Sequence, residues 1–576
     1  MEEQELVEIV KKLNDKRNVS FKCDEVDYRM FKGEVQTERN VFHTLTILFP
    51  TSFPLQLPQI RVVDYDKRYA HMESDGKLCL VDRSSILIKT TMPDQILIDC
   101  FDRACELLAV DTKSDDYANE IMREFDSYWL ANARLNIYSI LDEKEYGYSE
   151  MKMFVSRSVH VLASSLNEGK FFACNYLNAI DDDKSFVTKC IVISLRKKSK
   201  PIVLKESYKW SEIRRYILEN VSGSVKRRFK KFLGSYAREL MRYIVISLPG
   251  EYGNVMFGFR VEFNNKKKEK IEKITSAKVQ PVYIQRADRG YMLQRSGGET
   301  ALSKKNVLLL GCGSVGGYIA NNLCQLGIGA IDLLDNDFFS RENVHRHFLG
   351  FDSLTESITY KSVLLKNRLE KMYPYADIDS LDYTNRSVEN FIIQKERLKN
   401  YDLIISALGE PTLNLEINRV LYEDGITTPF LSCFNEPYGI GGHVIAVNIS
   451  HDSCLRCLYT DTISEDLVSF RASFVKENQY FKKNISGCSS AFVPYSCLDS
   501  QQTAIMASRL AIKILKKQVE QNEINSWVGD DTTLRDAGFV TSDFYKRKNI
   551  GDTEKMAIPV ARYCPVCHSK DRVWSL

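Results

Sequence analysis

The stretch between Val307 and Asp335 constrains the fold more than any other part of the sequence. It reads VLLLGCGSVGGYIANNLCQLGIGAIDLLD. A short apolar run predicts a buried strand, a glycine turn follows, and apolar residues at helical spacing predict a helix. A second apolar run, Ala330–Leu334, predicts another strand, which leads into Asp335. A strand–turn–helix–strand unit of this kind predicts an α/β sheet with a nucleotide-binding edge.

The glycines of the turn are Gly311, Gly313 and Gly316, at G-x-G-x-x-G spacing. Residues without a Cβ let a phosphate approach the backbone N–H groups at a helix N-terminus. Asp335 lies 24 residues after Gly311, where an acid can accept hydrogen bonds from ribose hydroxyls. A glycine-rich packing turn is the alternative, but the order of strand, helix, strand and acid favours a nucleotide site.

The residues after Asp335 favour ATP over a nicotinamide dinucleotide. Asp337, Asn343, Arg346 and Lys361 follow it in the chain. Cations offset the charge of the β and γ phosphates and of the leaving pyrophosphate, whereas nicotinamide chemistry needs none there.

This series resembles the ATP site of the ThiF/MoeB and ubiquitin-activating family, whose pattern is a glycine loop, then D-x-D, N-x-x-R and a lysine. The family acylates AMP with the C-terminal carboxylate of a protein. The resemblance implies a catalytic role for Arg346 and Lys361. It implies ATP binding by Gly311, Gly313, Gly316, Asp335, Asp337, Asn343, Arg346 and Lys361.

The resemblance also implies a Mg²⁺ ion and a homodimer formed through the adenylation domain. The family's magnesium-binding aspartate falls on Gly409, so the ligand is left open between Glu410 and Asp337. An N-terminal arginine of this family often reaches the partner's ATP, and Arg289 and Arg295 are the candidates here.

A second pattern precedes this region. Helices are expected at Glu2–Leu13 and Asp94–Val110, and strands at Phe31–Thr37 and Phe42–Phe49. A longer helical pattern covers residues 113–141. The order of these elements, with HMESDGKLCL before the second helix, resembles the ubiquitin-conjugating fold.

That resemblance implies that Cys79 carries a thioester and that His71 is the family's structural histidine. Met72 and Glu73 stand where Pro and Asn are usual in the family. The group that stabilises the oxyanion is therefore left open between Asp75, Asp82 and a backbone N–H group. The competing interpretation of Cys79 is a small buried hydrophobic residue.

Two C-x-x-C pairs predict a structural zinc site. Two C-x-x-C segments can supply the four sulfur ligands of a tetrahedral Zn²⁺ site, and four thiolates leave no position for a catalytic water. Two unrelated cysteine pairs are the alternative. The predicted ligands are Cys454, Cys457, Cys564 and Cys567.

Between these pairs lies a candidate nucleophile. Members of the activating family that pass their substrate on as a thioester carry a cysteine in the loop before the helix expected at residues 501–515. Cys488 in G-C-S-S fits an exposed nucleophile best, and Cys497 in Y-S-C-L is the second candidate. A structural free cysteine is the remaining interpretation.

The expected architecture is a multidomain α/β and α+β protein. It comprises a ubiquitin-conjugating-like α+β domain (1–145), a middle α+β domain (146–285) and a Rossmann-like adenylation domain with a split four-cysteine zinc site (286–576). The middle domain has strand patterns at 190–195, 243–248 and 256–263. It has no chemical motif, and its basic run at 226–231 is expected to be a solvated face.

Composition limits the partners and the compartment. A net charge of +3 does not indicate a nucleic-acid or membrane-surface partner. No apolar run reaches the roughly 18 residues of a membrane span. The 15 cysteines are odd in number and scattered, which is typical of a reducing compartment, so we expect a cytoplasmic protein.

The combination of both patterns on one chain resembles the conjugating–activating fusion proteins of bacterial CBASS anti-phage operons. The resemblance implies an enzyme that activates the C-terminus of a cGAS-like nucleotidyltransferase and ligates it to a target amine. The acyl group would pass through Cys488 and then Cys79. The alternatives are a sulfur-carrier activating enzyme of the ThiF/MoeB kind, which needs no Cys79, and a binding scaffold with an inactive conjugating fold.

Overall fold

The computed structural model describes residues 1–568 apart from 38–40, 64, 66–68, 82–85, 111–113, 143–146, 158, 183–184, 206, 237–240, 251–252, 264–268, 276, 355–358, 382–387 and 483–492. The chain divides into two compact units, Met1–Tyr291 and Met292–Leu576. Among the described helices, none combines the length and the apolar character that a membrane crossing requires.

The first unit begins with an antiparallel sheet covered by two amphipathic helices. The sheet has the order β1-β2-β3-β4. Buried and exposed residues alternate along β2 and β3, so one face of the sheet enters the core. The elements are α1 (Glu3–Arg17), β1 (Lys22–Cys23), β2 (Met30–Gln36), β3 (Phe42–Leu48), β4 (Gln59–Val62) and α2 (Pro93–Ala109).

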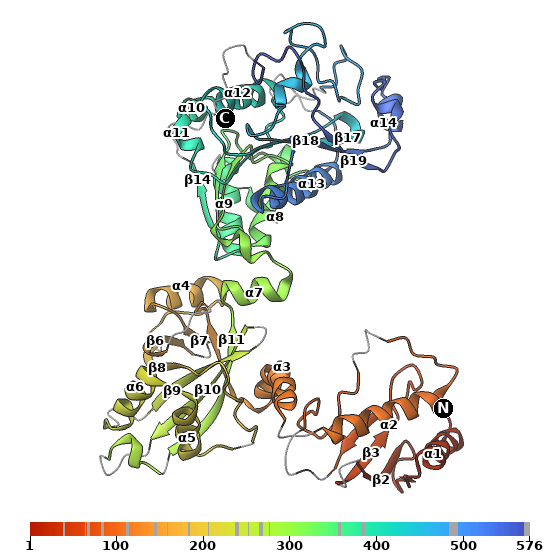
Figure 1. The fold of residues 1–576 in the computed structure, drawn as a ribbon, viewed down its shortest axis with the longest axis vertical. Coiled ribbons are helices and arrows are strands. Elements are labelled where there is room, and N and C mark those ends of the chain that lie inside the picture. The colour runs from red at the N-terminus through yellow and green to blue at the C-terminus, as the bar shows by residue number, and fades with distance from the viewer. Residues whose placement is uncertain are drawn as a thin grey trace. The chain divides into compact units, whose positions relative to one another are not determined.

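The rest of the first unit is a closed β-barrel (Figure 1). Its order around the barrel is β10-β11-β5-β7-β6-β8-β9. The predicted strands coincide with parts of β8, β9 and β10, and the first of them extends one residue beyond β8. The strands are β5 (Leu135–Ser139), β6 (Tyr148–Ser156), β7 (Val159–Leu162), β8 (Phe186–Ser194), β9 (Met241–Gly250), β10 (Gly253–Phe263) and β11 (Ala277–Arg286). The helices are α3 (Asp115–Asn132), α4 (Leu166–Tyr176), α5 (Trp210–Asn220) and α6 (Gly223–Leu233).

The helix expected over residues 113–141 is wrong beyond Asn132. The chain leaves α3 there, and β5 pairs in parallel with β11. Ile137 lies eight residues after Trp129, a spacing that suits a helix as well as a strand. Pairing across the barrel decides the outcome, because it satisfies the backbone groups of this segment.

Two apolar clusters show how the barrel is packed. Alternate residues of β9 belong to different clusters: Ile244 lies with residues of α3, α5 and α6, whereas Val245 lies in a cluster without helix residues. The first cluster therefore covers the outside of the barrel and the second fills its inside. Helix α3 is fixed to the barrel by Trp129, whose ring N–H donates to the carbonyl of Val282 at 2.8 Å.

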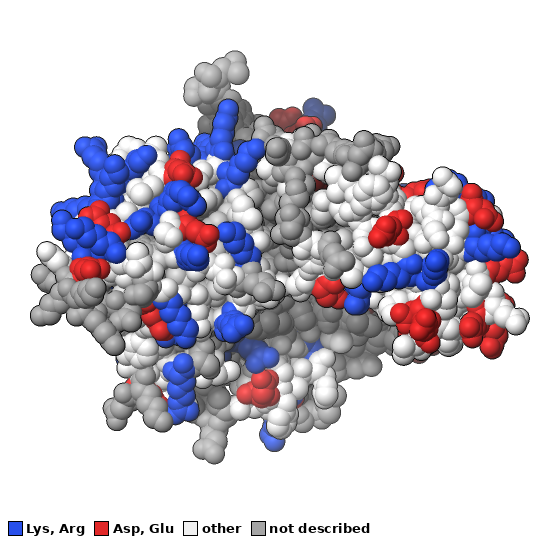
Figure 2. All heavy atoms as spheres, turned by 90° about the horizontal axis from the view of Figure 1, so that it is seen from below, with Lys and Arg blue, Asp and Glu red and all other residues white. Residues whose placement is uncertain are grey.

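The basic run of the barrel is solvated, as expected. Figure 2 shows Lys and Arg side chains gathered at its left, over the barrel. Helix α6 buries Phe229 and Leu233 against the barrel and exposes its basic residues. These residues are Lys226, Arg227, Arg228, Lys230 and Lys231.

The second unit contains an eight-stranded sheet of order β14-β13-β12-β15-β16-β17-β18-β19. The first five strands are parallel, and the last three add antiparallel pairs. The strands are β12 (Asn306–Leu310), β13 (Ala330–Leu334), β14 (Asp377–Ser380), β15 (Leu403–Ser406), β16 (Phe430–Asn435), β17 (Gly441–Val447), β18 (Glu523–Val528) and β19 (Thr553–Ala557).

Helices cover both faces of this sheet (Figure 1). One apolar cluster joins the sheet to α8 (Gly316–Leu326), α9 (Lys361–Met372) and α13 (Cys497–Leu515). The other joins it to α10 (Val388–Ile393) and α12 (Pro411–Glu423). Such a doubly covered parallel sheet is the fold expected from the glycine turn.

The strand order places a crevice at one end of β12. The chain runs from β12 to β13 and β14 on one side, then returns to β15 and β16 on the other. Leu310 is level with both Leu334 and Ser406, so the carboxyl ends of three strands meet there. Ligands bind at such a switch point in open α/β sheets.

Candidate functional site

The glycine turn has the geometry that its spacing predicts. Gly311 has a φ of 89°, and a Cβ on it would lie 2.9 Å from the carbonyl oxygen of Ala407. A Cβ on Gly316 would lie 1.9 Å from the carbonyl oxygen of Gly311. A Cβ on Gly313 would meet no atom within 4 Å. Two glycines are therefore required by the turn, and Gly313 leaves space for a ligand.

That space is part of a cavity of about 330 Å³ at the switch point. Four predicted residues line it: Gly313, Asn343, Arg346 and Lys361. The remaining wall is formed by Ser314, Val315, His347, Ala407, Leu408, Gly409, Cys433, Phe434, Asn435, Val493 and Tyr495. Gly311, Gly316, Asp335 and Asp337 are not among its lining residues.

Asp335 holds the glycine turn in place. Its carboxylate accepts hydrogen bonds from the N–H of Cys312 at 2.6 Å and from the N–H of Asp337 at 2.7 Å. Burial raises the pKa of Asp335, and the charge of Lys361 opposes that rise. The backbone contacts give this aspartate a structural role, and its contact with a ribose stays a prediction.

Two cations face the cavity. Lys361 is the first residue of α9, and its Nζ lies 2.9 Å from Oδ2 of Asp337. The guanidinium of Arg346 lies 5.9 Å from the ring centroid of Tyr495. Tyr495 is in turn 3.1 Å from Ser314, measured between the two hydroxyl oxygens. The arrangement suits an anionic ligand such as a polyphosphate, because positive charge and open backbone meet in one cavity.

His347 is a cavity residue that the sequence analysis missed. Its Nε2–H donates to the carbonyl of Cys312 at 2.5 Å, and its Nδ1 accepts from the N–H of Leu349 at 3.0 Å. Burial lowers the pKa of His347 to about 4, so the ring is neutral at pH 7. Nothing in the sequence distinguishes this buried histidine from an ordinary polar neighbour of Arg346.

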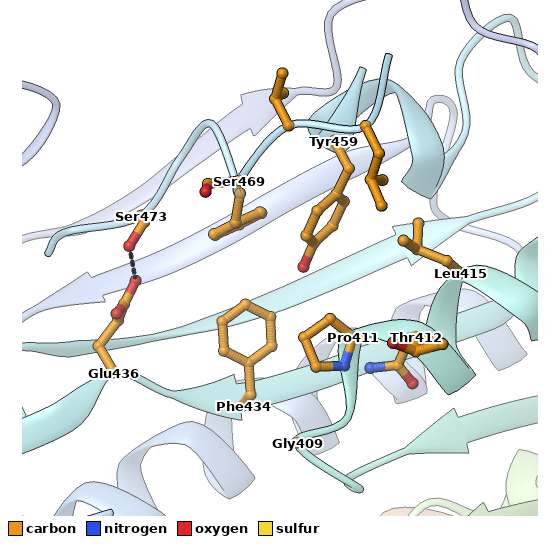
Figure 3. Close-up of a pocket in the computed structure, with 13 residues that line it drawn as sticks. Gly409, Pro411, Thr412, Leu415, Phe434, Glu436, Tyr459, Ser469 and Ser473 are labelled. Carbon is orange, nitrogen blue, oxygen red and sulfur yellow. Dashed lines mark hydrogen bonds between the residues drawn. The ribbon is translucent and has the colours of Figure 1, made fainter. Parts of the chain in front are cut away.

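A larger cavity of about 530 Å³ adjoins the first and shares Gly409 and Phe434 with it. Figure 3 shows the rings of Phe434, Pro411 and Tyr459 facing its interior. At its other end Ser473 donates a hydrogen bond to Glu436 at 3.0 Å. This cavity therefore has an apolar floor and one carboxylate, and it opens beside the predicted nucleotide site.

The four predicted zinc ligands lie together. Their sulfur atoms are all within 4.8 Å of one another. The Sγ–Sγ distances are 4.0 Å for Cys454–Cys457, 3.6 Å for Cys454–Cys564 and 3.4 Å for Cys457–Cys567. A tetrahedron with Zn–S bonds of about 2.3 Å has edges of about 3.8 Å, so the donor set fits Zn²⁺.

The cysteine cluster connects remote parts of the second unit. Cys454 precedes a short helix over Leu455–Tyr459, and the N–H of Leu455 donates to Oδ1 of Asn418 on α12 at 3.0 Å. Cys564 and Cys567 lie 110 residues beyond their partners. A bound metal would fix the C-terminal segment against α12.

Cys79 is exposed, as a nucleophile must be. Its N–H donates to the carbonyl of His71 at 2.6 Å, and an antiparallel bridge joins Met72 to Leu78. Of the two candidate acids, Asp75 lies 3.3 Å from Arg61, measured from Oδ2 to the guanidinium, and Asp82 lies outside the described residues.

Comparisons with known proteins find a family for each of two parts of the chain. Residues 288–529 match the ThiF family, and residues 12–137 match the prokaryotic E2 family B. The chain joins an E2-type domain to a ThiF-family domain. Both family resemblances stated from the sequence are therefore confirmed.

The relatives extend over nearly the whole chain. A Vibrio cholerae protein described as "ATP-dependent ubiquitin transferase-like protein Cap2" is 25% identical over 85% of this chain and 88% of its own. A Pseudomonas aeruginosa protein of that description is 22% identical over 81% of this chain and 83% of its own. An Escherichia coli protein of that description is 22% identical over 94% of this chain and 92% of its own.

The two candidate nucleophiles of the ThiF domain differ in what the structure describes. Cys488 lies outside the described residues. Cys497 is half-buried and is the first residue of α13, whose N-cap Ser496 accepts a hydrogen bond from the N–H of Asp499. Because Val493 and Tyr495 line the smaller cavity, α13 begins close to it.

The magnesium ligand of the ThiF domain stays open. Glu410 directly precedes α12, and the side chain of Asp337 is 72% exposed. Within the described ranges, the cysteine quartet is the one group of three or more potential metal ligands. Arg289 and Arg295 both lie on α7 (Arg289–Ser296), and their contact with a partner's ATP stays a prediction.

Proposed function

We propose that this protein is an ATP-dependent ligase that activates the C-terminal carboxylate of a protein and joins it to an amine. One observation carries the proposal. Gly313, Arg346 and Lys361 surround one cavity at the switch point of the ThiF domain, on the same chain as an E2-type domain with an exposed cysteine. The relatives described as ubiquitin transferase-like match over most of their length and support it.

The first step is adenylation. A carboxylate oxygen attacks the α-phosphorus of ATP, the bond to the bridging oxygen breaks, and pyrophosphate leaves with the electron pair. Arg346 and Lys361 stabilise the negative charge that grows on the leaving group. The open backbone at Gly313 holds phosphate oxygens, and Asp335 accepts from the ribose. A Mg²⁺ ion, held by Asp337 or Glu410, would supply further positive charge.

Thiols then carry the acyl group. The thiolate of Cys488, or of Cys497, attacks the acyl carbon and AMP leaves. The Cys79 thiolate takes the acyl group next and releases the first thiolate. A neutral amine finally attacks this thioester, the Cys79 thiolate leaves, and the amine loses a proton to solvent. Each step exchanges one leaving group for another, so one ATP suffices.

The activated protein is proposed to be a cGAS-like nucleotidyltransferase, and the acceptor an amine on a target protein. The larger cavity would receive the residues that precede the activated carboxylate, because it adjoins the adenylation site and has an apolar floor. A homodimer through the ThiF domain, with Arg289 or Arg295 reaching the partner's ATP, is part of the same proposal.

The test is to mix the protein with ATP and the products of its neighbouring genes, and to look for DTT-sensitive adducts on a non-reducing gel. We expect ATP-dependent thioesters and, later, a DTT-resistant conjugate. A sulfur-carrier activating enzyme would give adenylation without an adduct on Cys79. A scaffold would still join partner to target after Cys79→Ala, which would contradict our proposal.

A further inference from the structure

The segment that carries Cys79 is held by a histidine in a strained conformation. His71 has a φ of 59°, in the left-handed region that residues other than glycine seldom adopt. Its carbonyl accepts the N–H of Cys79 at 2.6 Å. A strained residue persists only where its surroundings over-determine it, and such residues cluster at functional sites.

The surroundings of His71 are two carboxylates of α3. Nδ1 of His71 lies 2.5 Å from Oε1 of Glu124, and Nε2 lies 3.3 Å from Oε2 of Glu120. An ionised carboxylate can only accept, so both ring nitrogens must carry a proton to satisfy these contacts. The hydrogen bond with Glu124 also raises the pKa of His71. These contacts favour the doubly protonated imidazolium form of the side chain.

Further contacts fix the same segment on α3. The hydroxyl of Tyr128 accepts the N–H of His71 at 2.6 Å and donates to Glu124. Ala70 packs in one apolar cluster with Phe125 and Trp129 of α3. Helix α3 thus contacts the backbone of His71, its ring and the preceding Ala70.

The residues next to His71 do not provide this support. Glu73, where the conjugating family usually has Asn, pairs with Lys77 at 2.9 Å and lies at the surface. Met72 is buried in the apolar core. The hairpin from His71 to Cys79 pairs with β4 through the backbone of Ile60 and Val62, and α3 supplies the contacts with the His71 ring.

We propose that Glu124 and Glu120 are positioning residues for Cys79, acting through the imidazolium of His71. The inference rests on the proposed function in that Cys79 is the acyl carrier. Glu124 is the stronger partner, because its contact is shorter and Tyr128 orients it. Glu120 also pairs with Arg123 at 2.8 Å, which weakens its hold on His71.

The proposal predicts a loss of order as the pH rises through the pKa of His71. When the pH rises through the raised pKa of His71, the ring loses one proton and one carboxylate loses its donor. The charged and titratable groups around the ring are Glu120, Glu124, Tyr128 and Arg123. Burial opposes the shift, but hydrogen bonds from His71 and Tyr128 lower the pKa of Glu124, so this carboxylate stays ionised as the pH rises. We assign the expected loss of protection to His71, and the variant His71→Asn tests this assignment.

Hydrogen exchange of the full chain tests this without ATP or a partner. The Cys79 N–H, corrected for intrinsic exchange rates, should lose protection as the pH rises through the His71 pKa. Glu124→Gln keeps the shape but removes the charge, so the loss should move to lower pH. His71→Asn tolerates the left-handed backbone and should remove the step, with exchange about tenfold faster. Glu120→Gln should act more weakly.

Glu106→Gln on α2 is the matched control, because Glu106 pairs with Arg103 at the surface. It should leave the profile of Cys79 unchanged. The same protection in wild type, Glu124→Gln and His71→Asn overturns the inference, whether or not Cys79 carries a thioester. If the hydrogen-exchange profile of Cys79 shifts in the variants but no thioester forms on Cys79, the proposed function is overturned and the positioning of Cys79 by His71 still stands.

The functional arm measures discharge of the Cys79 thioester to free lysine. Glu124→Gln should lower this rate and move the pH at which the rate begins to fall to a lower value, while ATP–pyrophosphate exchange stays at the wild-type rate. A purely structural role would lower the amount of folded protein and leave the pH profile where it is. Equal discharge rates and equal profiles in the two proteins overturn the positioning role.

Discussion

Nζ of Lys361 lies 2.9 Å from Oδ2 of Asp337, with the lysine side chain 11% exposed and the aspartate side chain 72% exposed. The lysine is enclosed at the cavity wall, whereas its partner faces solvent. An ion pair with a solvated partner contributes little to stability, typically below about 1 kcal/mol. The enclosed lysine is better explained by an anionic ligand than by folding.

Lys361→Ala should slow ATP–pyrophosphate exchange by about 100-fold, because it removes a cation from the developing pyrophosphate. Lys366→Ala is the matched control, since Lys366 lies on the same helix and pairs with Asp379 outside the cavity. It should retain the wild-type rate. Equal rates in wild type and Lys361→Ala would remove Lys361 from the ATP site.

Arg346→Ala should have an effect of similar size, about 100-fold, measured in the same exchange assay. Arg346→Lys keeps the charge but loses the planar guanidinium, so its exchange rate should lie between those of the wild-type protein and Arg346→Ala. Arg341, which is exposed in the same loop, provides the control Arg341→Ala. A slow Arg341→Ala protein with a normal Arg346→Ala protein would reverse the assignment.

The glycine turn and the strands and helix around it agree well with the sequence prediction, because their parts are local. Glycine spacing, the strand on either side and the apolar face of α8 are short-range signals, and β13 has the predicted bounds. The four cysteines predicted to bind zinc also lie together in the structure, since C-x-x-C spacing places two thiols on one turn even when the pairs are 110 residues apart.

Long-range pairing was not predictable. Closure of the barrel depends on β5 lying beside β11, whose partner residues Leu135 and Val282 are far apart in the chain. The contact of the His71 ring with Glu124 likewise depends on a later helix, and no sequence spacing connects these two residues. Burial of His347 follows from packing against Cys312, which an isolated histidine does not reveal.

Cys454→Ser should lower the zinc content from one ion per chain and destabilise the ThiF domain by about 2 kcal/mol or more, because the fourth thiolate is lost. Elemental analysis and thermal unfolding measure both effects. Cys174→Ser changes a thiol of the first unit outside the cluster and should alter neither. Zinc-free protein with an unchanged Tm after Cys454→Ser would exclude the metal site.

His347 predicts a loss of stability in acid. Its pKa is about 4 in the folded chain against a usual value of 6.5, so the unfolded state binds the proton first. The free energy of unfolding should be unchanged above about pH 7 and fall as the pH drops below 6.5. The loss should be about 2 kcal/mol at about pH 5, levelling off below about pH 4.

Urea unfolding of His347→Gln should remove this acid-dependent loss. His345→Gln is the control, because His345 is exposed two residues earlier. His345→Gln should show the same dependence of the free energy of unfolding on pH as the wild-type protein. If the free energy of unfolding of His347→Gln depends on pH as in the wild-type protein, the acid sensitivity belongs to other groups.

The order of the thiols gives the last prediction. Cys488 belongs to the same domain as the adenylation cavity, whereas Cys79 belongs to the E2-type domain, so we expect the acyl group to reach Cys488 first. Cys488→Ala should abolish every thioester and leave pyrophosphate exchange intact. Cys79→Ala should leave a thioester on Cys488 and stop ligation, because transfer between thiols is nearly isoenergetic and needs no second ATP.

A non-reducing gel with a DTT control distinguishes these outcomes. Cys23→Ala removes the other exposed thiol of the E2-type domain and should behave as wild type. Charging of Cys79 in the Cys488→Ala protein would contradict the relay through Cys488. Cys497→Ala in that background then separates the two remaining routes: if charging stops, Cys497 is the donor, and if it continues, Cys79 attacks the adenylate itself.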